Sequence, residues 1–120
     1  LSYTSFEYSE ITLDKNILKQ DESINVSVKV KNTGNFDGEE VVQLYLKDEV
    51  RSITAPVRQL KGFQKIFLKK GVSKTVTITL SANDLKFYNS ELKFVAEPGK
   101  FKVFVGGNSN AEMSAEFELE

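Results

Sequence analysis

Hydrophobic and polar residues alternate with a period of two along most of this chain. In residues 23–31 every second side chain is a branched aliphatic one, and the residues between them are polar or charged. Because successive side chains of a strand point to opposite faces, such a segment is a strand with one buried face. The other segments predicted as strands are 6–13, 42–47, 60–67, 74–80, 92–96, 101–105 and 115–119.

Glycine, asparagine and proline lie between these segments, as turns require. They occur at residues 32–34, 37–38, 70–71, 98–99 and 106–110. Glycine and asparagine there are able to adopt positive φ, and Pro98-Gly99 matches the central positions of a type II turn. Ser81, with Asp84 three residues later, predicts one short capped helical turn.

About seven short strands with one buried face each predict two antiparallel sheets packed face to face. No segment has the helical periodicity needed to cover a parallel sheet, which excludes α/β folds. The predicted fold class is therefore all-β, an immunoglobulin-like β-sandwich, and 120 residues suit a single domain over residues 1–120. The predicted core contains Val26, Val28, Leu44, Leu46, Ile78, Phe101, Val103 and Phe117.

The charge of the chain is nearly balanced, with a net value of −1, so no overall field favours nucleic acid or an anionic membrane. One basic run contains no acid: Arg58, Lys61, Lys65, Lys69, Lys70 and Lys74. It is either a nucleic-acid patch that offers Phe63 and Phe67 to bases, or a strand and turn whose lysines keep an edge soluble. The second interpretation is favoured, because no RNA-binding signature accompanies the run. No apolar run approaches the ~20 residues of a membrane helix.

The chain has no histidine and no cysteine, which removes Ser-His-Asp and Cys-His catalysis, the HExxH motif and ordinary zinc sites. Acidic pairs occur at residues 21–22, 39–40 and 48–49. Since neighbours on a strand face opposite sides, these pairs are interpreted as solvated charges rather than a glycosidase dyad. Residues 35–39 lack the ligand spacing of a calcium loop. No catalytic residue, metal or cofactor is predicted.

Five motifs occur in order along the whole chain. They are LSYTSFEYS at residues 1–9, VKVKNTG with DGEEVVQLY at 28–45, SITAPVRQLKGF at 52–63, FY at 87–88 and EPGKFKVFVG at 97–106. Together they resemble the C-terminal fibronectin type III-like domain of family 3 glycoside hydrolases, of β-glucosidase or β-xylosidase type. Many members carry Arg immediately before the proline, where this chain has Ala55, and Arg58 replaces a commoner Lys.

The resemblance implies a non-catalytic module that packs on the catalytic domains of a parent enzyme and stabilises them. The parent would hydrolyse terminal β-linked sugars and would be periplasmic or secreted. The family's catalytic motifs contain Trp and His, and this chain has neither, so the catalytic machinery is expected upstream of Leu1. Residues 1–6 would be the lead-in from the preceding domain.

Residues 48–59 form a long connection without alternation but with several apolar side chains. Connections in compact domains have a median length of about 4–6 residues, and longer ones tend to be functional. Together with the lead-in, this segment is predicted to dock on the catalytic domains; alternatively, Ile53 and Val57 fold back on their own sandwich. The predicted docking residues are Leu1, Tyr3, Phe6, Val50, Ile53, Pro56 and Val57.

Two other functions stay open: an independent polysaccharide-binding module and an adhesion-type sandwich. Glycan-binding surfaces usually present Trp, which this chain lacks, but Tyr45 lies at the outward parity of its strand. A coplanar strip of exposed aromatic side chains would favour glycan binding.

Overall fold

The computed structural model describes residues 4–49, 58–88 and 93–120. The elements in chain order are β1 (Phe6–Leu13), β2 (Ile17–Leu18), β3 (Ser23–Asn32), β4 (Gly38–Asp48), β5 (Gln59–Leu68), β6 (Ser73–Ser81), η1 (Ala82–Leu85), β7 (Phe87–Tyr88), β8 (Phe94–Val95), β9 (Gly99–Gly106) and β10 (Met113–Leu119). Within the described residues, seven of the strands have seven or more residues, in agreement with the predicted number. No helix in these three ranges is long and apolar enough to cross a membrane.

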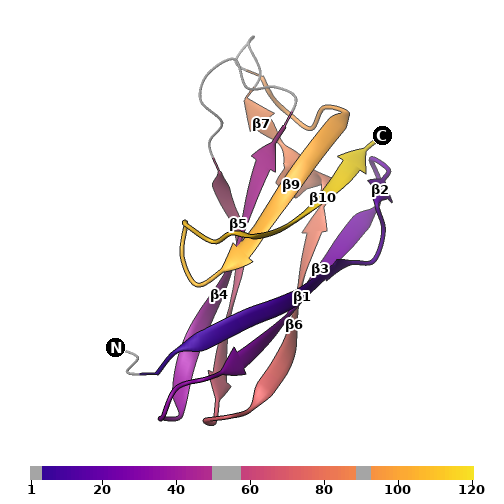
Figure 1. Cartoon of the computed structure of the whole chain (residues 1–120). Helices are drawn as coiled ribbons and strands as arrows, with labels where there is room; N and C mark the ends of the chain where they lie inside the picture. The colour runs from indigo at the N-terminus through magenta and orange to yellow at the C-terminus, as the bar shows by residue number, and fades with distance from the viewer. Residues whose placement is uncertain (1–3, 50–57, 89–92) are drawn as a thin grey trace.

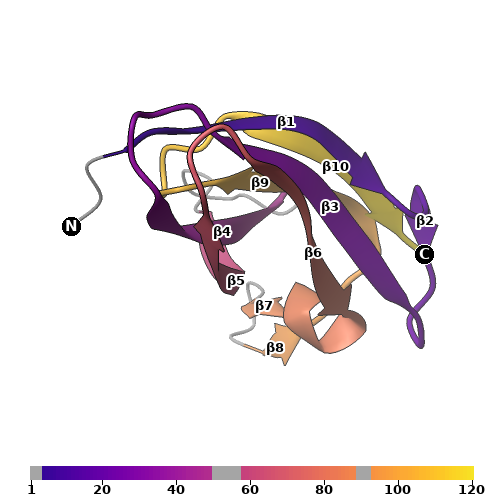
Figure 2. The same ribbon diagram turned by 90° about the horizontal axis from the view of Figure 1, so that it is seen from below.

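The strands form two sheets that pack face to face (Figures 1 and 2). One sheet has the order β1-β3-β6 and the other has the order β2-β10-β9-β4-β5, while β7 and β8 pair separately. The long strands pair antiparallel, and the two-residue β2 runs parallel to β10. The predicted all-β sandwich is therefore confirmed.

The predicted alternation decides which side chains enter the space between the sheets. In β3 the residues from Ile24 to Asn32 are buried at every second position. Seven of the eight predicted core residues are buried, and Phe101 stacks on Phe117 with ring centroids 5.7 Å apart. Ile78 is the exception: it is partly buried and packs against the core.

One predicted turn glycine behaves as expected, and two differ from the prediction. Gly71 has φ +81°, as predicted for a turn glycine. Gly34 does not have positive φ in the structure. Instead, a Cβ on Gly34 would lie 2.6 Å from the amide nitrogen of Ser5, so glycine is required for space. Gly99 has φ 146° where a type II turn needs about 80°, and it opens β9 instead.

The short helical turn after Ser81 is present as the 3-10 helix η1. The Asp84 carboxylate accepts hydrogen bonds from the Ser81 amide at 2.8 Å and from its hydroxyl at 3.2 Å. The predicted capping interaction therefore forms, although the turn is narrower than an α-helix.

Candidate functional site

The two predicted docking segments begin at opposite ends of the sandwich. Phe6 opens β1 beside Asn32, at the end where β4 starts. Asp48 and Gln59, which flank the other segment, lie at the far end of β4, roughly 35 Å away along an eleven-residue strand (Figure 1). Phe6 is half-buried and packs against the core. Leu1, Tyr3, Val50, Ile53, Pro56 and Val57 lie outside the described residues.

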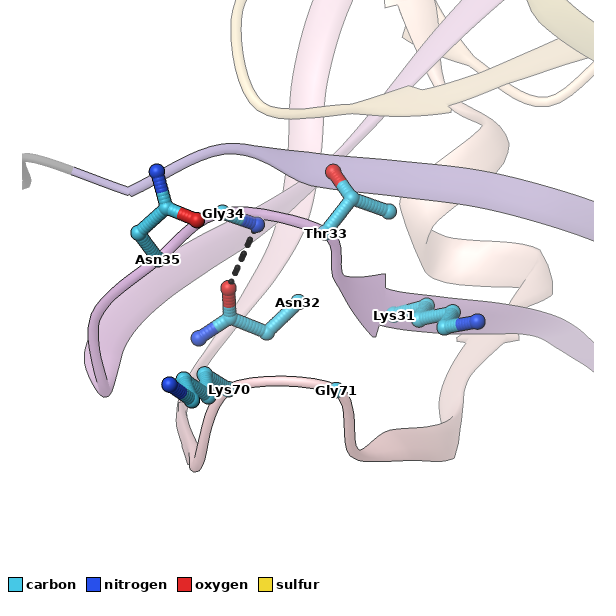
Figure 3. A pocket seen from close by; sticks show the side chains of 7 residues that line it. All are labelled: Lys31, Asn32, Thr33, Gly34, Asn35, Lys70 and Gly71. Carbon is cyan, nitrogen blue, oxygen red and sulfur yellow. Dashed lines mark hydrogen bonds between the residues drawn. The ribbon is translucent and has the colours of Figure 1, made fainter.

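Asn32 joins the segments that meet where β3 ends. It is fully buried, and its amide nitrogen donates to the carbonyls of Leu68 at 2.9 Å and Phe36 at 2.8 Å. Its side-chain oxygen accepts from the Thr4 hydroxyl at 2.6 Å. The same oxygen accepts from the Gly34 amide at 3.1 Å (Figure 3). The lead-in, the β3–β4 loop and the end of β5 are thereby held together by one side chain.

Sequence reasoning assigned Asn32 to a turn and missed this role. The signal was the alternation itself, since Ile24, Val26, Val28 and Val30 are followed at the same parity by Asn32. A polar residue at a buried position must be hydrogen-bonded, so it marks a structural junction.

A shallow depression lies beside this junction, between the β3–β4 loop and the β5–β6 turn. Figure 3 shows the side chains of Lys31 and Lys70 at its sides, with Asn32 between the loop and the turn. All the polar atoms of the Asn32 amide group take part in the hydrogen bonds given above. The depression therefore offers exposed lysines but no convergent set of buried polar groups, and we assign it no binding role.

Tyr8 and Glu40 form a second polar contact, in a hollow beside the β9–β10 loop. The Tyr8 hydroxyl donates to Glu40 Oε2 at 2.9 Å. Burial, and then the negative charge of Glu40, raise the pKa of the Tyr8 phenol well above its usual range. A Cβ on Gly107 would lie 2.9 Å from the same carboxylate oxygen, so a side chain there would crowd the pair.

The outer surface of β4 and β5 is apolar, although it faces away from the core. Phe63 is 68% exposed, Phe67 58% and Leu60 50%, and Val41 projects beside them from β4. We call these four residues the β4–β5 face. Register places Gln43 opposite Phe63 and Val41 opposite Lys65, whose ammonium lies 2.8 Å from the Glu39 carboxylate.

The basic run does not form one continuous patch within the part of the chain that the structure describes. The Arg58 guanidinium lies 3.6 Å from the centroid of the Phe104 ring, and its Nη1 donates to the carbonyl of Ala111 at 2.6 Å. Lys65 pairs with Glu39, and Lys61 Nζ donates to the carbonyl of Lys86 at 3.4 Å. Since β5 is the edge of its sheet, this arrangement favours the interpretation that the lysines keep an edge soluble.

The outer surface of the other sheet is polar. Ser27 and Thr77 share a hydrogen bond of 2.9 Å across β3 and β6, and Thr79 donates to Asn25 at 2.7 Å. Asn25 in turn donates to Asp14 at 3.0 Å. Small hydroxyl and amide side chains that satisfy one another are typical of a sheet that faces water.

Comparison with known proteins agrees with this architecture and with the motifs. The model of the family "Fibronectin type III-like domain" matches residues 40–109, more than half of the chain. The chain belongs to this family. The predicted resemblance to the domain in family 3 glycoside hydrolases is confirmed by the relatives, which include β-glucosidases and β-xylosidases.

The relatives are much longer than this fibronectin type III-like domain. It is 46% identical over 119 residues to a periplasmic β-glucosidase of Salmonella typhimurium, and the match spans 99% of the domain but 16% of the relative. It is 48% identical over 110 residues to the thermostable β-glucosidase B of Acetivibrio thermocellus, spanning 91% of the domain and 15% of the relative. The crystal structure of a Listeria innocua β-glucosidase in complex with glucose superposes with a TM-score of 0.85 at 41% identity, again over 99% of the domain and 16% of that chain.

Of the three acidic pairs, Glu39 and Glu40 lie on a strand and face opposite sides, as strand geometry predicts. Glu39 pairs with Lys65 on the outer surface, whereas Glu40 accepts from Tyr8. Glu22 accepts from the Lys19 amide at 2.9 Å, and Glu49 lies 3.8 Å from Lys47. Among residues 4–49, 58–88 and 93–120, no three acidic, His or Cys side chains gather closely enough to hold a metal.

Proposed function

We propose that this domain is a non-catalytic scaffold module of a longer β-glucosidase-like or β-xylosidase-like glycoside hydrolase, in which it packs on the catalytic domains and stabilises them. The supporting observation is the extent of the match: nearly the whole domain aligns with about a sixth of a single-chain β-glucosidase. The parent would hydrolyse terminal β-linked sugars, the activity class that the names of the relatives state.

Docking through the lead-in and residues 48–59 belongs to this proposal. The lead-in continues directly into β1, where Thr4 is bonded to Asn32, so a force on the chain upstream is transmitted to the core. Residues 48–59 begin at the opposite end, at the last residue of β4. Contacts at two ends of a rigid sandwich would fix its orientation more firmly than contacts at one end.

The test is to change Ile53 and Val57 to Ser, both in the isolated domain and in the full parent chain. We expect the parent chain to lose thermal stability while the melting temperature of the isolated domain barely changes. Equal losses in both proteins would show that the two side chains belong to the core of the domain, and docking through this segment would be rejected.

A further inference from the structure

Exposed apolar side chains are distributed unevenly over the domain. Of the seven large hydrophobic residues that are exposed in the described ranges, four form the β4–β5 face. None lies on β1, β3 or β6. Large exposed apolar patches on soluble proteins mark interaction sites. This uneven distribution therefore favours an interaction at the outer surface of β4 and β5 rather than at that of β1, β3 and β6.

The composition of the β4–β5 face is that of a protein interface. Phe63 and Phe67 project from the same side of one strand, four residues or roughly 13 Å apart. Lys65 lies between them on β5, and its ion-pair partner Glu39 stands opposite Phe67 in register. Aromatic anchors with few charges are typical of the centre of a protein interface.

The neighbouring strand β9 shows that this apolar surface is confined to β4 and β5. Phe104 of β9 lies across from Tyr45, and Arg58 covers its ring. Phe104 is therefore buried within the domain, whereas the two phenylalanines of β5 have no comparable cover. Their exposure is not relieved by any contact inside the described part of the domain.

The position of the lead-in favours a partner for the β4–β5 face that belongs to the same chain. The carbonyl of Ser5 accepts a hydrogen bond from the backbone amide of Thr33, and the backbone amide of Asn32 donates to the carbonyl of Val72. The lead-in therefore enters at the end of the sandwich where β5 terminates. Glu39, at this end of β4, pairs in register with Phe67. The relatives continue for about five-sixths of their length beyond the matched region. A tethered partner has an effective concentration that reaches the millimolar range, which favours it over a second copy in solution.

We propose that the β4–β5 face is the surface on which the catalytic domains of the parent chain pack, with Phe63 and Phe67 as the anchors. This inference rests on the proposed scaffold function and names the surface that performs it. The polar outer surface of β3 and β6 then faces solvent.

The experiment compares Phe63→Ser combined with Phe67→Ser in the full parent chain and in the isolated domain. Phe36→Ser is the matched control, because Phe36 is 60% exposed but lies in the β3–β4 loop. In the parent chain we expect the double variant to lower the melting temperature by at least about 2 °C, while the control and the isolated double variant stay unchanged. Hydrogen exchange at residues 60–68 should be slower in the parent chain than in the isolated domain, and the double variant should remove this difference.

Three results would overturn the inference. The first is an unchanged parent melting temperature in the double variant. The second is dimerisation of the isolated domain that the double variant abolishes, because a second copy would then occupy the face. The third is protection of residues 60–68 in the isolated domain by laminarin or xylan, which would make the face a glycan site. Deletion of the whole domain tests the scaffold function separately: if the catalytic domains keep their stability without it, the proposed function fails as well.

Discussion

At the scale of single residues, the buried side chain of Asn32 links segments that are far apart in the sequence. Of the described residues it is the one polar side chain classed as buried, and it makes four hydrogen bonds to three segments. We expect Asn32→Ala to lower the free energy of unfolding by at least about 2 kcal/mol, because buried backbone groups lose their partners. Urea denaturation measures this loss. Asn35→Ala, an exposed change in the same loop, is the control, and equal effects of the two would contradict the assigned role.

We expect Tyr8 to make the stability of the domain depend on pH in the alkaline range. Its pKa is raised by burial and by Glu40, so the native state keeps the phenol proton at a pH where the unfolded chain loses it. The unfolded phenol ionises near pH 10, and the free energy of unfolding should therefore fall as the pH rises above about 10.

Tyr8→Phe should make this decline shallower, in addition to a loss at neutral pH from the missing hydrogen bond to Glu40. The measurement is urea denaturation at a series of pH values from 7 to above 10. Tyr45→Phe is the control, since Tyr45 donates to Gln43 on the outer surface. Parallel curves for the wild-type domain and Tyr8→Phe would show that Tyr8 is not responsible.

At the scale of elements, the alternation of polar and apolar residues identifies the buried face of a central strand well. It predicts less well which side chains of the edge strand β5 face outward. The core residues of β3, β9 and β10 are those that the period of two assigns inward. In the β4–β5 pairing, Leu44 is opposite Gly62 but Tyr45 is opposite Leu60, so β5 carries one extra residue there, and Leu60 is exposed together with Phe63. A bulge depends on the partner strand, so no pattern within β5 alone reveals it.

The two-residue β2 illustrates the same limit. Ile17 and Leu18 pair in parallel with Glu118 and Leu119, about a hundred residues later in the sequence. Such a strand is stabilised by a distant partner rather than by its own periodicity, and the sequence did not predict it. The docking role of the candidate residues stays a prediction, because only Phe6 of that set lies in the described ranges.

Phe101→Ala tests the inward face of β9. Phe101 is buried and stacks on Phe117, so its truncation removes apolar burial and leaves a cavity between the sheets. We expect a loss of roughly 3–5 kcal/mol in the free energy of unfolding. Lys100→Ala, one position earlier and exposed, is the matched control in urea denaturation. A midpoint shift no larger than that of the control would mean that Phe101 does not face the core.

At the scale of the whole molecule, the domain combines one continuous core with two unlike outer surfaces. The core includes residues of both sheets, which makes cooperative unfolding of the isolated domain the expected behaviour. The proposal that only the β4–β5 face contacts the rest of the parent would explain why this face is apolar while the outer surface of β3 and β6 is polar. Under the proposed function, such a module would contribute rigidity and a docking surface to the parent rather than reactive groups.

The isolated domain should therefore hydrolyse neither aryl β-glucosides nor aryl β-xylosides. A retaining glycosidase needs two carboxyl groups about 5 Å apart, one of them with its pKa raised so that it acts as the acid. Here Glu39 and Glu40 point to opposite sides, each with its own partner, and histidine and cysteine are absent from the chain. Release of nitrophenol is the measurement, with Glu40→Gln as the control for a contaminating enzyme. Turnover that copurifies with the domain and disappears when one of its own carboxylates, such as Glu40, is changed to the amide would show that the domain has a catalytic carboxylate.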